Sequence, residues 1–158
     1  MIGATQTPST CNQFELEIPI DASRENVWNA IFEDVNSWWV ADFHMMGPDS
    51  IVTFDPTPGG NGLIEKTSDG GALLWYEVQM VLPADFKIYL VGHIAPEWGG
   101  PTISSLKLSL VESKNGCVFQ ISDARHGNVD DAQLSCSKDG WQQLFGDGLK
   151  KFVESGNT

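Results

Sequence analysis

The last stretch of the chain, residues 139–154, constrains the fold more than any other part of the sequence. Its large apolar residues recur every three or four positions, and glutamine, lysine and acidic residues stand between them. This spacing places the apolar side chains on one face of an α-helix and the polar ones on the other. The apolar residues are Trp141, Leu144, Phe145, Leu149, Phe152 and Val153. A helix with so aromatic a face needs a broad apolar partner, which we expect to be a curved β-sheet.

The same spacing extends towards the N-terminus as far as Leu134, which predicts one long helix that begins near Val129, capped by Asn128, with a bend at Gly140. Gly146 and Gly148 stand where helix-forming residues are expected, and each costs roughly 1 kcal/mol relative to alanine in a helix. These two glycines either let another backbone approach the helix or leave open space beside it.

Most of the preceding chain has the pattern of β-strands. Residues 14–20 alternate between apolar and polar, which predicts a strand with one buried face. Two short helices follow, one capped by Ser23 and one that ends in the adjacent pair Trp38 and Trp39. Two adjacent bulky residues cannot share one helix face, so we expect one to enter the core and its neighbour to line an opening or to meet the loops. Six further strands are predicted over residues 51–54, 63–67, 73–82, 86–94, 103–112 and 117–124.

The last two strands predict a hairpin. Asn115 and Gly116 form a strong signal for a two-residue turn. With these two residues in the loop, Leu110 faces Ile121 and Glu112 faces Phe119. Both apolar stripes then fall on one face of the sheet, as a sheet with one buried side requires.

Composition and charge limit the class of protein. The length of 158 residues suits one domain, which we place at residues 13–155 behind a disordered tail at residues 1–12. Twenty-one acidic and nine basic residues give a net charge of −12. Such a surface repels nucleic acid and anionic membranes, and no segment has the roughly 18 to 20 apolar residues of a membrane span. We therefore expect neither partner, and a monomer or weak homodimer.

The cysteines and histidines carry no recognisable site. Cys11, Cys117 and Cys136 are odd in number and widely spaced, which is typical of reduced thiols in a cytoplasmic protein without a signal peptide. The three histidines lack the spacing of metal ligands, and no Ser-His-Asp or Cys-His set is visible. We therefore predict no metal, no other cofactor and no catalytic residue.

The aromatic residues are the more informative set. Six tryptophans in a chain of this length exceed the needs of a core, which predicts a pocket lined by some of them. Trp75 and Tyr76 are adjacent on a strand, so only one of them should face inwards. Trp98 lies between prolines and glycines, where it can form a lid. The candidate ligand-binding residues are Trp38, Trp75, Tyr89, His93, Trp98, Phe119, Trp141 and Phe145.

Four short motifs resemble those of the START-like (SRPBCC) helix-grip superfamily, and most closely its heat-shock-protein ATPase-activator-like branch, which is grouped with polyketide cyclases. These motifs are residues 20–28, Ser37-Trp38-Trp39, residues 81–87 and the Gly140-Trp141 pair that opens the helix-grip segment. The resemblance covers roughly residues 12–154. It implies an α+β fold of Bet v type, in which a curved antiparallel sheet of seven strands wraps around the C-terminal helix, with two short helices after the first strand.

The resemblance implies a cavity between sheet and helix but no single chemistry, because function depends on the site and not on the fold. Our first hypothesis is a protein that binds a small apolar, aromatic or lipid-like molecule in this cavity. The alternative is a cyclase- or hydrolase-type enzyme in which Tyr89 and His93 orient or protonate a polarised oxygen. A further alternative is a co-chaperone-like interaction protein.

Overall fold

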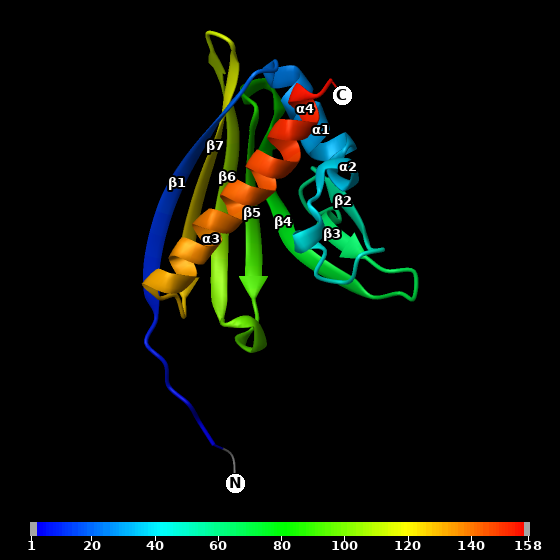
Figure 1. Ribbon diagram of the computed structural model, residues 1–158. Coiled ribbons are helices and arrows are strands. Elements are labelled where there is room, and N and C mark those ends of the chain that lie inside the picture. Colours follow the sequence, from blue (N-terminus) through cyan, green and yellow to red (C-terminus); the bar gives the residue numbers. More distant parts are fainter. Residues whose placement is uncertain (1–2, 157–158) are drawn as a thin grey trace.

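The computed structural model describes residues 3–156, and its centre is a curved antiparallel sheet of seven strands in the order β1-β7-β6-β5-β4-β3-β2 (Figure 1). The strands are β1 (Thr10–Ile20), β2 (Ile51–Asp55), β3 (Gly62–Lys66), β4 (Ala72–Leu82), β5 (Lys87–Ile94), β6 (Thr102–Ser113) and β7 (Gly116–Gly127). Except between β1 and β2, where α1 and α2 intervene, consecutive strands pair directly, while β1 closes onto β7. The predicted fold class is confirmed.

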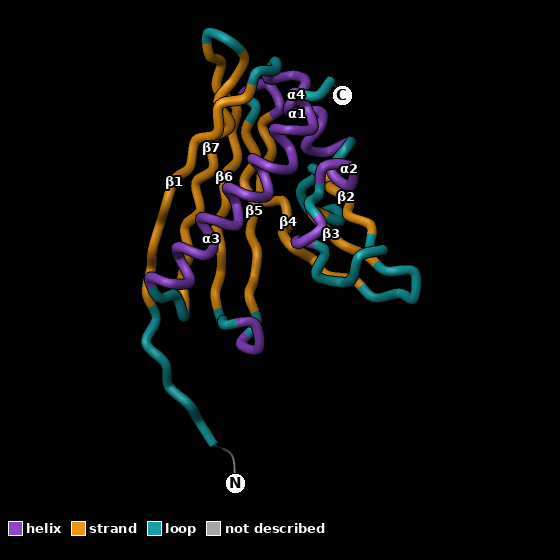
Figure 2. The backbone as a smooth tube through the Cα atoms, viewed as in Figure 1, coloured by secondary structure: helices purple, strands orange, loops and turns teal. Residues whose placement is uncertain are grey.

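Helices cover one face of this sheet. Two short helices, α1 (Arg24–Glu33) and α2 (Val35–Trp38), follow β1. The C-terminal helix runs diagonally across the sheet and consists of α3 (Asp131–Gln143), a π-helical segment η4 (Leu144–Lys150) and α4 (Lys151–Glu154) (Figures 1 and 2). Short 3₁₀ turns η1 (Ala41–Phe43), η2 (Pro83–Asp85) and η3 (Pro96–Trp98) lie in the loops. No helix within residues 3–156 is long and apolar enough to cross a membrane.

The C-terminal helix differs from the prediction in two places. It begins at Asp131 because Asp130 and Gln133 form a reciprocal capping box, whereas Asn128 donates to the carbonyl groups of Gly99 and Gly100. Regular α-helix continues through Gly140, and the irregularity lies in the π-helical segment instead. A Cβ atom on Gly148 would overlap the carbonyl oxygen of Trp38. Of the two roles left open for Gly148, the close approach of another backbone is therefore the observed one.

The hairpin register predicted from Asn115 and Gly116 was wrong by two residues. Leu110 pairs with Phe119, and the loop residues are Lys114 and Asn115. Gly116 is instead a paired residue at φ +148°, and a Cβ atom there would overlap the carbonyl oxygen of Ile20 at the end of β1. A shift of two residues preserves the inward faces of both strands, so the predicted apolar stripes still meet.

Both members of the tryptophan pair are buried, and Trp39 meets the loop at η1, which is one of the two placements expected for the second ring. Trp38 ends α2, and the backbone leaves the helix at Trp39, so the two side chains need not share a helix face. Each indole N–H has an acceptor: Trp38 Nε1 donates to the carbonyl of Ala30 at 2.7 Å and Trp39 Nε1 to that of Phe43 at 3.0 Å. Burial of both rings therefore leaves no indole hydrogen bond unmade.

The start of the chain is extended. Residues 1 and 2 of the predicted tail lie outside the described residues, and residues 3–9 are exposed without regular secondary structure (Figure 1). Regular structure begins at Thr10, whose hydroxyl donates to the carbonyl of Val129 at 2.9 Å. The boundary of the folded domain near residue 13 stays a prediction.

Candidate functional site

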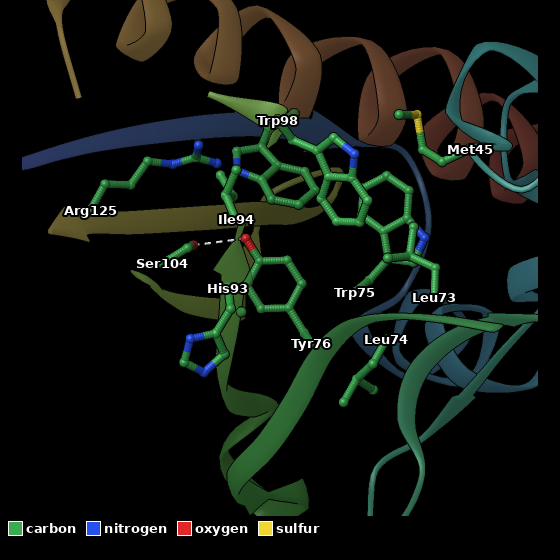
Figure 3. Close-up of a pocket in the computed structure, with 12 residues that line it drawn as sticks. Met45, Leu73, Leu74, Trp75, Tyr76, His93, Ile94, Trp98, Ser104 and Arg125 are labelled. Carbon is green, nitrogen blue, oxygen red and sulfur yellow. Dashed lines mark hydrogen bonds between the residues drawn. The ribbon is translucent and has the colours of Figure 1, made fainter. Parts of the chain in front are cut away.

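A hollow of about 200 Å³ lies between the sheet, the C-terminal helix and two loops. Its walls are mostly apolar and include three tryptophans and a tyrosine, and its polar groups gather at one end (Figure 3). Strands β4 to β7 supply Trp75, Tyr76, Ser104 and Arg125, α3 supplies Trp141, and the η3 loop supplies Trp98. The arrangement combines a large apolar surface with a few fixed polar groups, as small-molecule sites commonly do.

A β-bulge brings Trp75 and Tyr76 to the same hollow. Leu63 on β3 pairs with Tyr76 while the next residue, Ile64, pairs with Leu74, so Trp75 is an extra residue on β4. The bulge interrupts the alternation of side chains between the two faces of the strand. The expectation that only one of the two rings could face inwards was therefore wrong.

Gly92 on β5 makes room for the Tyr76 ring. A Cβ atom at this position would lie 2.7 Å from Cε1 of Tyr76 and 2.8 Å from the carbonyl oxygen of Trp75. Because glycine has no side chain, the ring crosses β5 and its hydroxyl reaches Oγ of Ser104 on β6 at 2.7 Å. The absent side chain on one strand thus permits a contact between its two neighbours.

The polar end of the hollow is organised around the fully buried carboxylate of Asp123 on β7. Three groups donate to it: Ser104 Oγ at 2.6 Å, Arg125 Nε at 2.9 Å and Trp141 Nε1 at 2.8 Å. Trp141 thereby ties the C-terminal helix to the sheet. Since an ionised carboxylate only accepts, the single hydroxyl proton of Ser104 is directed at Asp123. Tyr76 must then be the donor in its hydrogen bond with Ser104.

Tyr76 stays neutral across the physiological range. Burial, followed by the negative charge of Asp123, raises the pKa of Tyr76 well above its usual value, and the hydrogen bonds with Ser104 and Arg125 offset only part of this effect. With its proton directed at Ser104, the phenol oxygen can act only as an acceptor towards the hollow.

A second hollow of about 210 Å³ adjoins the first. The two share Ile94, Trp98 and Arg125 as lining residues, and the second continues towards Gln133 and Cys136 on α3. The Trp98 side chain is 65% exposed, and Gln133 donates to the carbonyl group of Gly99 beside it at 3.0 Å. Trp98 therefore borders both hollows, and its role as a lid stays a prediction.

The loop that carries Met45 is fixed by a second buried carboxylate, Glu65 on β3. Glu65 accepts from Ser50 Oγ at 2.6 Å, from the backbone N–H groups of Met46 and Met45 at 2.7 and 3.3 Å, and from Trp75 Nε1 at 3.0 Å. Burial works to raise the pKa of Glu65, but these hydrogen bonds outweigh it and hold the pKa below the usual value. Glu65 thus positions both Trp75 and the loop of Met45, which line the hollow.

The structure places the predicted site residues in three groups. Trp75, His93, Trp98 and Trp141 line the first hollow, although His93 is exposed and its imidazole points away from the aromatic side chains in Figure 3. Trp38, Phe119 and Phe145 are buried in the core behind it, where Phe145 contacts the rings of Trp141, Trp38 and Phe119. Tyr89 pairs with Lys107 on the outward face of the sheet.

Sequence reasoning missed the polar half of the site, namely Tyr76, Ser104, Asp123 and Arg125, together with the supporting Glu65. A signal was available on β7. Asp123 and Arg125 continue the alternation of Phe119 and Ile121, so two charged residues stand at positions that the pattern turns inwards. A charged side chain at a buried position requires a partner and marks a candidate site.

The histidine, cysteine and acidic side chains of the described residues are scattered. Residues 3–156 contain no cluster of three or more histidine, cysteine or acidic side chains that would hold a metal ion. The three cysteines are free, and burial raises the pKa of Cys117 to about 11.

A curved antiparallel sheet that wraps a C-terminal helix, with a hollow between the two, defines the helix-grip class. The sequence profile described as "Activator of Hsp90 ATPase homolog 1-like protein" matches residues 21–154. The chain belongs to this family, as the sequence motifs predicted.

Solved structures with the same fold include proteins of distant sequence. An uncharacterised protein from Rhizobium leguminosarum has a TM-score of 0.67 at 14% identity over 94% of this chain and 97% of its own. Ara h 8.0201 has a TM-score of 0.65 at 17% identity over 92% and 99%. An AHSA1-like protein from Aeromonas hydrophila has a TM-score of 0.62 at 17% identity over 92% and 94%. A comparison with curated protein sequences finds no match.

Proposed function

We propose that this protein binds a small aromatic or apolar molecule in the hollow between Trp75, Trp98 and Trp141. The observation that carries the proposal is the composition of this hollow, whose walls are mostly apolar with four aromatic side chains and whose polar groups gather at one end. An apolar cavity with a single polar end suits a binding protein. The polar groups at this end hydrogen-bond mainly one another, since Ser104, Arg125 and Trp141 all donate to Asp123. Folds of this kind commonly hold hydrophobic ligands, which agrees with the proposal.

The volume of the hollow sets the size of the ligand. An engineered cavity of about 150 Å³ in another protein accommodates benzene. At about 200 Å³, the hollow would take a single ring with one short substituent, or roughly ten non-hydrogen atoms. At roughly 0.5 kcal/mol per atom, such a ligand would bind with about 5 kcal/mol, which corresponds to a Kd of roughly 0.2 mM.

Two alternatives receive less support. The enzymatic hypothesis relied on Tyr89 and His93, which stand at outward positions on β5, paired with Lys107 and Ile103 of β6. The family description refers to activation of a chaperone ATPase, and a role as a co-chaperone stays a further hypothesis. A cytoplasmic location remains a prediction that rests on the free thiols.

Calorimetric titration with a set of single-ring compounds tests the proposal. Ile94→Trp should weaken any binding at least tenfold, because Ile94 lines both hollows and the larger side chain would fill them. Ile103→Trp is the matched control, because Ile103 lies on the opposite face of the neighbouring strand and is 42% exposed. Both variants should keep a cooperative thermal transition. Absence of saturable binding to the unaltered protein would sink the proposal, and so would equal binding by the two variants.

A further inference from the structure

The polar end of the hollow contains a cationic side chain, Arg125, to which the proposed function assigns no role. Arg125 is 8% exposed, and its side chain lines both the first and the second hollow. Within residues 3–156, its ion pair with Asp123 is made through Nε, on the stem side of the guanidinium group. The two terminal nitrogens carry the other four N–H donors of the fork. The Arg125 side chain also hydrogen-bonds the Tyr76 hydroxyl, which leaves further donors of the fork, and their planar arrangement matches a carboxylate.

Asp123 holds Arg125 in place, but Arg125 is only one of the groups that donate to its carboxylate. Ser104 and Trp141 also donate to this carboxylate, so its charge is shared among three donors that come from β6, β7 and α3. The guanidinium group is thereby ordered before any ligand arrives. Pre-ordering reduces the entropy that a binding partner would otherwise lose.

The direction of the hydrogen bonds selects the polarity of the ligand. Ser104 donates to Asp123 and Tyr76 donates to Ser104, so neither hydroxyl proton is directed at the hollow. An acceptor group of the ligand therefore finds its donors at Arg125. A cationic group placed there would instead be repelled.

We infer that the ligand is an aromatic carboxylate, whose carboxylate group binds the terminal nitrogens of Arg125 while its ring lies among Trp75, Trp98 and Trp141. This inference rests on the proposed function and names the chemical class of its ligand. The net charge of −12 opposes an approaching anion, but surface charges are screened beyond about 8 to 10 Å at physiological ionic strength. The buried guanidinium group acts at contact distance.

Three probes of nearly equal shape test the inference by calorimetric titration at neutral pH: phenylacetate, phenylacetamide and phenethylamine. A charge-assisted pair is roughly twice as strong as a neutral hydrogen bond. We expect phenylacetate to bind about tenfold more tightly than phenylacetamide, and phenethylamine to bind more weakly than both.

Variants assign this preference to Arg125. Arg125→Lys keeps the charge but loses the fork, and should reduce the acid-to-amide ratio of affinities severalfold. The double variant Asp123→Asn with Arg125→Met removes both charges together, so that no buried charge is left unpaired, and should bring the ratio to about one. Lys107→Met, on the outward face of β6, is the control and should retain the full ratio. Thermal melts establish that each variant is folded.

Each outcome separates the two proposals. Binding of all three probes with equal affinity would leave the proposed function standing and overturn this inference, as would tightest binding of the amine. Failure of every probe to bind would overturn both. A preference for the acid that survives in the double variant would place the carboxylate elsewhere and also overturn the inference.

Discussion

At the scale of single residues, two buried carboxylates are stabilised in different ways. Asp123 has a cation, Arg125, among its three donors. Glu65 is equally buried, but its four donors are neutral groups of Ser50, Met45, Met46 and Trp75. Ser50 gives its proton to Glu65, so His44 Nδ1, at 2.8 Å from Ser50 Oγ, must be the donor in that contact. The buried charge of Glu65 is therefore stabilised by hydrogen bonds from neutral groups alone, and replacement of one carboxylate oxygen would disturb them.

Glu65→Gln should destabilise the protein by about 1.5 to 3 kcal/mol. The NH₂ group of the new amide would face the hydrogen-bond donors that surround Glu65, and the N–H groups among them cannot accept its hydrogens. Urea unfolding measures the change. Glu15→Gln, at an exposed position of β1, is the control and should stay within about 0.5 kcal/mol of the parent. A Glu65→Gln variant as stable as this control would contradict the described hydrogen bonds.

The pH dependence of stability should carry the signature of Glu65. Its folded pKa lies below the unfolded value, so the folded state binds fewer protons through this group. The resulting stability is fully present above the unfolded pKa and is lost as the pH falls through the folded pKa. Urea unfolding between pH 6 and pH 3 should therefore show a decline below about pH 4.5 that is smaller in Glu65→Gln. An identical slope in both proteins would disprove this assignment.

Gly92 is the position where a single methyl group should disturb the site. Gly92→Ala would press on the Tyr76 ring and on the carbonyl of Trp75, at a cost of about 1 to 3 kcal/mol in unfolding free energy. Gly140→Ala is the matched control, because a Cβ atom there meets only Cζ of Phe43 at 3.7 Å and lies in a regular helix. We expect that control to gain up to about 1 kcal/mol. Similar changes in both variants would show that β5 has more room than the structure indicates.

At the scale of elements, the π-helical segment η4 lies where the C-terminal helix meets the end of α2. Gly148→Ala would drive a methyl group into the backbone oxygen of Trp38, which cannot move aside, and should cost about 1 to 3 kcal/mol. Gly146→Ala, in the same segment, meets only the flexible side chain of Gln142 at 3.1 Å and should be neutral or slightly stabilising. Thermal unfolding compares the two, and a reversed order would refute the role of Gly148.

At the scale of the whole molecule, the periodic segments were predictable from sequence. The alternation of Leu106, Leu108 and Leu110 requires a sheet with one buried side, and the helical spacing of Trp141, Leu144 and Phe145 supplies the element that covers it. Both patterns depend only on which face of a local element is apolar. The packing of the helix on the sheet then follows, because few layer arrangements can bury the apolar faces of both elements.

The site was less predictable because it depends on contacts between distant segments. Leu73, Leu74, Trp75 and Tyr76 are all apolar or aromatic, so their sequence contains no sign of the bulge among them. The ring of Tyr76 reaches Ser104 only across Gly92, which is remote from both in sequence. By contrast, the buried charge of Arg125 was detectable as a break in an apolar stripe.

The reactivity of the three thiols should report on the fold as a whole. Cys11 and Cys136 are exposed, whereas Cys117 is buried where β7 begins and its pKa is raised to about 11. The thiolate is the reactive form, so two thiols should react rapidly with a disulfide reagent at pH 8 and the third only after unfolding. A third rapid thiol in the native protein would contradict the burial of Cys117.

Strand β4 contains a second bulge besides the one at Trp75. Each bulge shifts the inward–outward alternation of the side chains by one residue, so the second shift cancels the first. Val78 pairs with Leu90 and Met80 with Tyr89, so Gln79 is a second extra residue on β4. Leu73 and Val81 both pair with inward residues of the neighbouring strands, and they are eight positions apart. A simple alternation of faces along β4 therefore predicts the orientation of both residues correctly. The same alternation wrongly predicts that Tyr76 and Val78, which lie between the bulges, point outwards.

A deletion within a strand ordinarily reverses the inward and outward faces of every residue on one side of the deletion. Deletion of Gln79 should instead restore a regular ladder and leave a cooperative melt, whereas deletion of Ser105 from the unbroken register of β6 should abolish folding. Strand β4 should therefore tolerate the loss of Gln79 without any change in which side chains face the hollow.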